Sequence, residues 1–277
     1  MKLTLKDSCK VTKFSAIFQH LKQLVDCIAI YFSEDGMYIQ GMDNTQICLF
    51  ECKILNTWFD EYEFANNVDD PRVCMNTAIL HKVISAVDEK HAIQISYSGS
   101  TDILNIKFAD PSDNMYNKCF EISLMDFDSD LMNIPREESH VDLTIDTSKF
   151  SKLVSQLLIF SNVLTLTFSD QDIKFRAEGS EGAMSSKIDL DDVNEYAIGE
   201  DSVLTQSYSL TYINLMCNFC KLNKSIVMGF SDNMPMSLTY DLDEDKETTD
   251  DEMDEVDKVD KEKKCFVGFY LAPKIDE

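Results

Sequence analysis

The sequence of 277 residues predicts an α+β protein that consists of two tandem copies of one domain. The segment TKFS at residues 12–15 recurs as SKFS 136 positions later, and the strand-like run at 28–33 recurs at 164–169 with the same offset. A second helical stretch followed by a strand appears in both halves, at 76–97 and 209–230. We therefore expect strand, helix, several strands, helix and several strands in each half.

The individual elements follow from the spacing of apolar residues. The expected strands alternate apolar and polar residues, as in ILNIKF at 103–108 and VDLTI at 141–145. Such alternation buries one face and solvates the other, which is typical of antiparallel sheets. The expected helices carry apolar residues at positions i, i+3, i+4 and i+7, which form one buried stripe. Four such stretches are predicted, at residues 8–25, 76–87, 148–162 and 209–224.

Changes in composition mark the domain boundaries. We expect a first domain at 1–123, a connecting segment at 124–140 and a second domain at 141–277, because the middle segment loses its regular period and contains Pro135. Within the second domain, residues 241–264 contain 13 acidic residues and 5 lysines, a net charge of −8. This composition predicts an acidic insertion loop at 243–264.

The distribution of charge points to the ligand. The chain has a net charge of −25, yet the four helical stretches, 61 residues in total, contain no acidic residue, where roughly 11 would be expected at the average content. An ordinary solvated helix face would explain their polarity but not the missing carboxylates. Lysines beside phosphates gain affinity from counterion release, so the pattern predicts a bound polyanion, with nucleic acid as the first candidate. The lysines concerned are Lys10, Lys13, Lys22, Lys82, Lys149, Lys152, Lys221 and Lys224.

The cysteines and histidines predict no metal or redox chemistry. Several of the nine cysteines, such as Cys27, Cys48, Cys119 and Cys265, lie in apolar runs, which favours buried reduced thiols over disulfides. Cys217 and Cys220 form one C-x-x-C on the apolar side of a helical pattern, so we expect core packing for both. The four histidines have no spacing suited to a metal.

Motifs of the common enzyme classes are absent. The sequence contains no glycine-rich phosphate loop, no H-E-x-x-H and no G-x-S-x-G. Asp126 and Asp128 lie in the polar connecting segment, where solvated side chains are far more plausible than a catalytic pair. We expect no enzyme and no cofactor. An apolar run of membrane-spanning length and the apolar core of a signal peptide are also lacking, which predicts an intracellular protein.

Three blocks of sequence resemble the proliferating cell nuclear antigen (PCNA) family of eukaryotic-type DNA sliding clamps. They are IQGMD at 39–43 followed by ICLF at 47–50, LMDFD at 124–128 followed by IP at 134–135, and YLAPKIDE at 270–277. The resemblance covers both halves and leaves out chiefly residues 243–264. It therefore implies a divergent member with an acidic insertion.

The resemblance implies a homotrimeric ring of six similar domains, with helices lining a channel for duplex DNA and antiparallel sheets outside. The eight lysines would contact phosphates without sequence preference, and the channel positions Ser15, Ala16, Ser85, Ser155, Thr211 and Asn218 are neutral where close relatives are basic. The ring would close by pairing the edge at 119–124 with the edge at 183–190 of the next subunit. The interface residues would be Cys119, Phe120, Ile122, Ser185, Lys187 and Ile188.

The resemblance also implies a pocket for partner proteins. DNA polymerase, flap endonuclease, ligase and clamp loader would bind through a short motif, Q-x-x-[apolar]-x-x-[aromatic]-[aromatic], with Ala272 and Ile275 offering backbone pairing. Two pocket positions depart from the family, Gln46 where histidine is usual and Met132 where leucine is usual. The matching positions are Met42, Asp43, Gln46, Leu49, Met132, Ile134, Pro235, Tyr270, Leu271, Ala272, Pro273, Lys274 and Ile275.

These features favour a DNA polymerase processivity factor located in the nucleus, or at a viral replication site if the source is a large DNA virus. The alternative is one subunit of a heterotrimeric checkpoint-type clamp in the DNA damage response. The intact linker and C-terminal blocks favour the first, and the reduced charge of the channel favours the second. An acidic scaffold that does not encircle DNA is a third possibility, and the acid-free helices count against it.

Overall fold

The computed structural model describes residues 1–64, 72–88, 90–110, 112, 116–127, 131–134, 138–243 and 264–274. These residues form two compact units, which are considered separately. The first unit comprises the described parts of Met1–Gly41, Glu51–Leu131 and Asp241–Val267, and the second those of Met42–Phe50, Met132–Tyr240 and Gly268–Glu277. Most of the acidic insertion expected at 243–264 lies outside the described residues.

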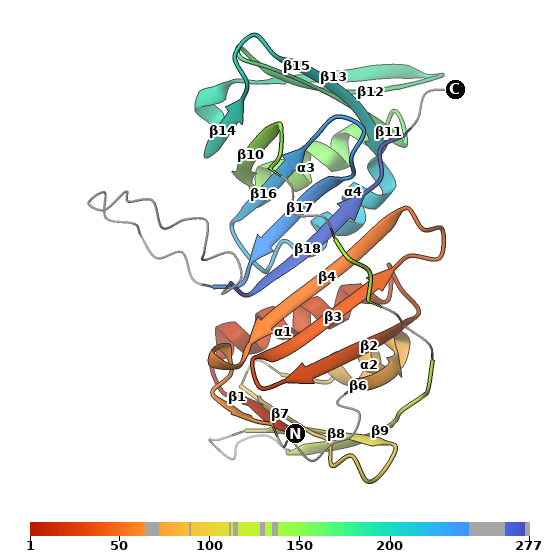
Figure 1. Cartoon of the computed structure of the whole chain (residues 1–277), viewed down its shortest axis with the longest axis vertical. Helices are drawn as coiled ribbons and strands as arrows, with labels where there is room; N and C mark the ends of the chain where they lie inside the picture. Colours follow the sequence, from red (N-terminus) through yellow and green to blue (C-terminus); the bar gives the residue numbers. More distant parts are fainter. Residues whose placement is uncertain are drawn as a thin grey trace, which may run out of the picture. The chain divides into compact units, whose positions relative to one another are not determined.

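The order of elements is the same in the two halves of the chain (Figure 1). The first half contains β1 Lys2–Leu5, α1 Ser8–Leu21, β2 Cys27–Ser33, β3 Gly36–Met42, β4 Cys48–Leu55, a 3-10 turn Asn56–Trp58, β5 Glu61–Glu63, β6 Arg72–Asn76, α2 Thr77–Ile84, β7 Ala92–Ser96, β8 Ile103–Ala109 and β9 Lys118–Ser123. The second half contains β10 Val141–Asp146, α3 Thr147–Leu157, β11 Val163–Ser169, β12 Ile173–Gly179, β13 Gly182–Ile188, a 3-10 turn Leu190–Asp192, β14 Glu195–Ile198, β15 Val203–Ser209, α4 Leu210–Cys217, β16 Ser225–Phe230, β17 Met236–Asp241 and β18 Phe266–Leu271. The predicted α+β duplication is confirmed.

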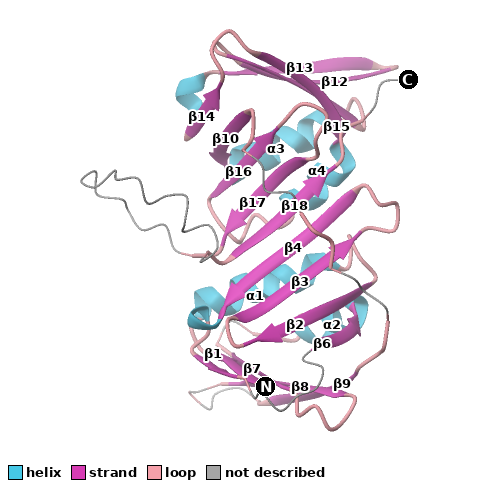
Figure 2. Ribbon diagram, in the orientation of Figure 1, coloured by secondary structure: helices cyan, strands magenta, loops and turns pink. Residues whose placement is uncertain are grey.

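The order of strands within the sheets repeats as well. Figure 2 colours the strands magenta and the helices cyan. The order β5-β1-β7-β8-β9 in the first half corresponds to β14-β10-β16-β17-β18 in the second. In the same way, β4-β3-β2-β6 corresponds to β13-β12-β11-β15. Neighbouring strands run antiparallel, as in the pairing of Val141 with Phe230 and of Leu3 with Ile95. The alternation of apolar and polar residues therefore predicted the sheet type correctly.

Polar side chains fix where the helices begin. The Asp7 carboxylate accepts a hydrogen bond from the Lys10 amide at 2.9 Å, and the Asp146 carboxylate accepts one from the Lys149 amide at 2.8 Å. These N-caps satisfy amides that have no partner in the first turn. The helices are shorter than the apolar pattern predicted: α1 ends at Leu21 rather than residue 25, because its last turn tightens into bonds such as Gln23 N–H to His20 O, 3.0 Å.

Aromatic residues build a separate core in each unit. In the first unit, α1 packs against α2, and the ring of Phe14 lies edge-on to that of Phe18 at 4.8 Å. In the second unit, α3 packs against α4, and Phe219 and Phe269 lie 5.0 Å apart between their ring centroids. Each of these side chains except Phe18 is fully buried, so both units have a true hydrophobic core.

All nine cysteines are free thiols, but not all are buried as expected. Burial raises the pKa of Cys48, and of Cys217, to about 12, which suits a purely structural role. The expectation was wrong for Cys119 and Cys220, which are exposed. Cys119 points to the solvent side of β9, and Cys220 follows the end of α4 by three residues. Among the described residues, no His, Cys, Asp and Glu side chains cluster as metal ligands would.

Candidate functional site

The helical lysines fall into two groups, and the first group is exposed. Lys149 and Lys152 are three positions apart on α3 and therefore share one face. Lys82 is exposed on α2, while Lys221 and Lys224 follow the end of α4. Within the described part of the chain, none of these five ammonium groups forms a hydrogen bond or an ion pair. They are therefore available to an anionic ligand.

The second group is held by the protein itself. Lys10 Nζ donates a hydrogen bond to the carbonyl of Trp58 at 2.8 Å and lies 5.6 Å from the centroid of its indole ring. Lys13 Nζ donates to the carbonyl of Leu242 at 2.9 Å. Both lysines are half-buried and their ammonium groups are bound to backbone carbonyls, so a ligand would have to compete with these hydrogen bonds. Lys22 is exposed, with Nζ 3.4 Å from His81 Nδ1.

Two positions expected to face the channel are not accessible. Ser15 is 5% exposed and Ala16 is 1% exposed, because α1 is buried on more than one side. Their lack of charge therefore reflects core packing rather than weaker contact with a ligand, and the expectation for these two positions is wrong. Ser85, Ser155 and Thr211 are exposed as a channel position would be.

The first turns of the helices show the same avoidance of negative charge. None of the helices α1, α2, α3 and α4 has an acidic residue in its first turn. The positive end of the helix dipole would favour carboxylates there by about 0.3–1 kcal/mol each. Helix stability alone would therefore place acids at these positions. Their absence agrees with the bound polyanion that the sequence predicts.

The loop from Asp43 to Cys48, which joins β3 and β4, is organised around one carboxylate. Asp43 Oδ1 accepts hydrogen bonds from the amides of Ile47 at 2.8 Å and Cys48 at 2.6 Å. Its Oδ2 accepts from the Thr45 amide at 2.9 Å, from the Thr45 hydroxyl, and from the hydroxyl of Tyr212 at 2.6 Å. Five donors therefore converge on a side chain that is only 6% exposed.

These bonds decide the charge of Asp43. Burial alone would raise its pKa, but the hydroxyls of Thr45 and Tyr212 and the amides of Cys48 and Thr45 outweigh burial and lower the pKa to about 2. Burial, followed by the bond to Asp43, raises the pKa of Tyr212. Asp43 is thus a carboxylate and Tyr212 a neutral donor at neutral pH.

The C-terminal segment is tied to this loop by its backbone. The Ala272 amide donates to the carbonyl of Ile47 at 3.0 Å, and the Lys274 amide donates to the carbonyl of Ser207 at 2.7 Å. The Ala272 N–H is therefore already bound within the chain, and backbone pairing of Ala272 with a peptide stays a prediction. Ile275 lies outside the described residues.

The remaining members of the expected pocket set belong to the second unit. Met132 is 39% exposed, Pro235 is exposed, and Ile134, Tyr270 and Pro273 are half-buried. Met42 is also half-buried, Gln46 and Lys274 are exposed, and Leu49 and Leu271 are buried. Ile47, which is 39% exposed beside Gln46, is not among the pocket residues predicted from the sequence. Its place in an alternating run concealed it, since such a run normally predicts a half-buried strand.

The expected interface residues lie on strands at the ends of their sheets. Among the described residues, β9 has β8 as its only neighbour in the strand order, and β13 has only β12. On β9, Cys119 is exposed, Phe120 half-buried and Ile122 buried; on β13, Ser185 and Lys187 are exposed and Ile188 half-buried. Edge strands carry N–H and C=O groups that can pair with another chain.

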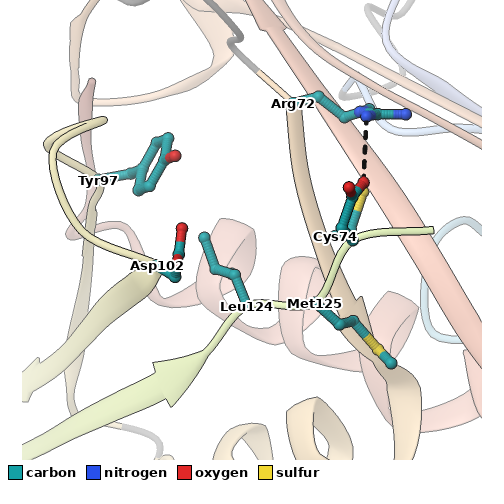
Figure 3. Close-up of a pocket in the computed structure, with 7 residues that line it drawn as sticks. Arg72, Cys74, Tyr97, Asp102, Leu124 and Met125 are labelled. Atoms are coloured by element: carbon teal, nitrogen blue, oxygen red, sulfur yellow. Dashed lines mark ion pairs between the residues drawn. The ribbon is translucent and has the colours of Figure 1, made fainter.

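A hollow of about 460 Å³ lies elsewhere, in the first unit (Figure 3). It is lined by Arg72 and Cys74 of β6, Tyr97, Asp102 and residues 124–126. Arg72 Nη2 lies 3.6 Å from Asp126 Oδ1, so its charge is partly satisfied within the wall. The Asp126 side chain is 96% exposed, which agrees with a solvated rather than a catalytic carboxylate.

Taken together, the repeated α+β unit, the acid-free helices and the free sheet edges define the architecture of a clamp domain protein. The chain matches the family model "Proliferating cell nuclear antigen, N-terminal domain" over residues 7–131 and the model of the C-terminal domain over residues 133–249. The chain therefore belongs to the proliferating cell nuclear antigen family.

Individual relatives agree with the family models. The chain is 27% identical to "Proliferating cell nuclear antigen 1" of Plasmodium falciparum (isolate K1 / Thailand) over 269 residues, which cover 94% of this chain and 93% of the relative. It is 22% identical to "Proliferating cell nuclear antigen 2" of Drosophila melanogaster over 262 residues, 94% and 93% of the two chains. Chaetomium thermophilum has a relative 23% identical over 265 residues, 93% and 92%.

Family membership fixes the general class of activity. Members of this family are non-enzymatic DNA sliding clamps that act as processivity factors in DNA replication and repair, so the chain is a sliding clamp and not an enzyme. Among the described residues, no helix is both long and apolar enough to span a membrane.

Proposed function

We propose that this chain forms a homotrimeric ring around duplex DNA and serves as a nuclear processivity factor of the replicative type. The observation that carries the DNA contact is a group of five exposed lysines whose ammonium groups have no partner among the described residues, in a chain of net charge −25: Lys82, Lys149, Lys152, Lys221 and Lys224. Such ammonium groups bind phosphates without reading bases, which suits a clamp that must slide.

Ring closure follows from the two edge strands. β9 and β13 each expose one side to solvent within the described residues, and pairing β9 of one subunit with β13 of the next would satisfy both. Because the two edges belong to different halves of the chain, the contact is head-to-tail and closes into a ring only at the correct rotation. The family resemblance favours three subunits.

Partner proteins would bind at the loop 43–48 and the C-terminal segment. In this proposal, Met42, Ile47, Met132 and Pro235 form the apolar pocket for the aromatic pair of the motif in DNA polymerase, flap endonuclease, ligase and clamp loader. The Ala272 carbonyl, rather than its amide, pairs with the peptide backbone. Exposed apolar side chains at Ile47 and Met132 suit such a role, because they lie on the surface before any partner binds.

The first test is the mass of the full chain in solution, measured by light scattering at low and moderate salt. A particle near three times 31.7 kDa supports the ring. Assembly only at moderate salt would show that repulsion between acidic subunits opposes closure. A monomer at both salts would refute the homotrimer and favour the alternative, a subunit of a heterotrimeric checkpoint-type clamp.

The second test separates DNA encirclement from simple binding. Trimer should remain on a closed circular duplex after a salt wash and should be lost once the circle is cut, because a ring is held by topology. Loss from the intact circle at the same rate as from the cut one would refute encirclement.

A further inference from the structure

We infer that Tyr212 is a positioning residue for the loop 43–48: its hydroxyl binds the Asp43 carboxylate and thereby holds the loop in the conformation that contacts a partner peptide. This inference rests on the pocket proposed above and deepens it. Tyr212 lies in the first turn of α4, 169 positions beyond Asp43 in the sequence, and both residues belong to the second unit.

The Tyr212 hydroxyl is the one donor to Asp43 that comes from outside the loop. The other four donors to Asp43 all come from the loop: the amides of Thr45, Ile47 and Cys48 and the hydroxyl of Thr45. The bond from Tyr212 is the only one of the five that anchors the carboxylate to another element. At 2.6 Å to a carboxylate oxygen, it is a charge-assisted hydrogen bond.

The loop needs such an anchor because part of its backbone is unfavourable. Gln46 has φ of 58°, in the left-handed region that residues other than glycine rarely adopt. A residue stays there only when its surroundings enforce it. The Gln46 amide donates to the Asp43 carbonyl at 3.0 Å, so the turn is closed from both the backbone and the side chain of Asp43.

A continuous series of hydrogen bonds connects this anchor to the pocket. The Tyr212 hydroxyl binds Asp43, Asp43 binds the Ile47 amide, and the Ile47 carbonyl binds the Ala272 amide. The two segments proposed to touch the peptide are therefore joined at Ile47. If the Asp43 carboxylate turns, Ile47 loses the bond that holds its amide and its exposed side chain is no longer held in place.

The decisive variant is Tyr212→Phe, which removes one oxygen atom and keeps the ring. The Tyr212 hydroxyl contacts two loop groups, Asp43 Oδ2 at 2.6 Å and Thr45 Oγ1 at 2.8 Å, and Tyr212→Phe loses both contacts. The control is Tyr196→Phe, because the Tyr196 hydroxyl donates a hydrogen bond within the second unit to the Ser169 carbonyl at 2.8 Å, far from the loop in sequence. The probe is a fluorescent synthetic peptide carrying the motif Q-x-x-[apolar]-x-x-[aromatic]-[aromatic]. Peptide affinity and amide hydrogen exchange at residues 43–48 are measured on the full-length wild type and both variants.

We expect Tyr212→Phe to weaken peptide binding by about 10-fold, the lower end of the range for one hydrogen bond to a charged group, while Tyr196→Phe leaves binding unchanged. Exchange at Ile47 and Cys48 should be faster in Tyr212→Phe than in the wild type and unchanged in Tyr196→Phe. Thr45→Val, which removes the second hydroxyl from Asp43, should act in the same direction.

The outcomes separate the role of the Tyr212–Asp43 hydrogen bond in the loop from the existence of the peptide pocket. Unchanged hydrogen exchange at residues 43–48 in Tyr212→Phe would show that the Tyr212–Asp43 hydrogen bond does not hold the loop, whatever the peptide affinity. Faster exchange with unchanged affinity would overturn the positioning role. If the wild type fails to bind the peptide, the proposed pocket and the role of Tyr212 in it are both wrong, and the exchange rates then show only whether the loop is held.

Discussion

Replacing Asp43 by asparagine should destabilise the protein in a manner that depends on pH. Both oxygens of Asp43 accept hydrogen bonds from backbone amides, Ile47 and Cys48 on one side and Thr45 on the other. Whichever way the asparagine amide turns, its NH2 group faces at least one N–H donor. The variant therefore loses a hydrogen bond and leaves a buried donor without a partner.

The magnitude follows from the pKa of Asp43. The pKa of Asp43 in the folded protein is about 2, against 3.8 for an ordinary aspartate, and each pKa unit corresponds to about 1.4 kcal/mol. Ionised Asp43 therefore contributes about 2 kcal/mol to the free energy of unfolding. Because the folded pKa is lowered, this contribution is complete above about pH 4 and is lost as the pH falls through about 2.

The assay is urea denaturation followed by far-UV circular dichroism, at matched protein concentration, for wild type and Asp43→Asn between pH 7 and pH 2.5. We expect the wild type to be more stable by about 2–3 kcal/mol at pH 7, and this difference to decrease by roughly 1.5 kcal/mol by pH 2.5. Asp142→Asn, at an exposed position of β10, is the control for removing one carboxylate elsewhere in the second unit. A difference that is the same at pH 7 and pH 2.5 would refute the reasoning.

Three further predictions concern the DNA-facing lysines, the subunit edge and the core. Lys149→Gln should reduce the salt dependence of DNA binding by up to about 0.9 in the log–log slope per subunit, or about 2.7 for the trimer, whereas Lys10→Met should leave the slope unchanged and lower stability by about 1 kcal/mol; equal slopes for both would contradict the division into exposed and held lysines. Cys119→Asp, on the β9 edge, should dissociate the trimer at concentrations where Asn105→Asp, exposed on the inner strand β8, remains trimeric by light scattering. Phe269→Ala should cost about 3–5 kcal/mol in urea denaturation, because this fully buried ring packs against two phenylalanines, and a loss under 1 kcal/mol would disprove that packing.

The sequence was informative where structure depends on local spacing. Element type and sheet type were both predicted from the alternation in β8 and β10 and from the apolar stripes of α1 and α3. An element with one buried face repeats its apolar residues every 2 positions in a strand and every 3.6 in a helix. The offset of 136 residues predicted the repeated order of elements. Helix ends were less predictable, since an apolar residue such as Leu24 is equally well buried in the turn after α1.

The details of the site depend on contacts that spacing cannot reveal. The bond from Lys13 to the Leu242 carbonyl joins residues 229 positions apart, and that from Tyr212 to Asp43 joins residues 169 apart. A periodic pattern shows which side of a helix is polar, but not which backbone carbonyl lies opposite a given lysine. The sequence therefore predicted eight equivalent lysines, although the structure divides them into exposed and held groups.

The positions of the acidic residues strengthen the argument for a polyanion at the helices. α1 and α3 each begin immediately after an aspartate, Asp7 and Asp146, and both carboxylates are turned back to accept an amide of their own helix. Carboxylates are thus tolerated at the helix start where the capping bond uses their charge, and they are missing from the turns that follow. General avoidance of acids near the helices would have removed Asp7 and Asp146 as well. The acid-free pattern therefore begins inside the helices, after the capping residues, which agrees with the proposed helix face beside DNA.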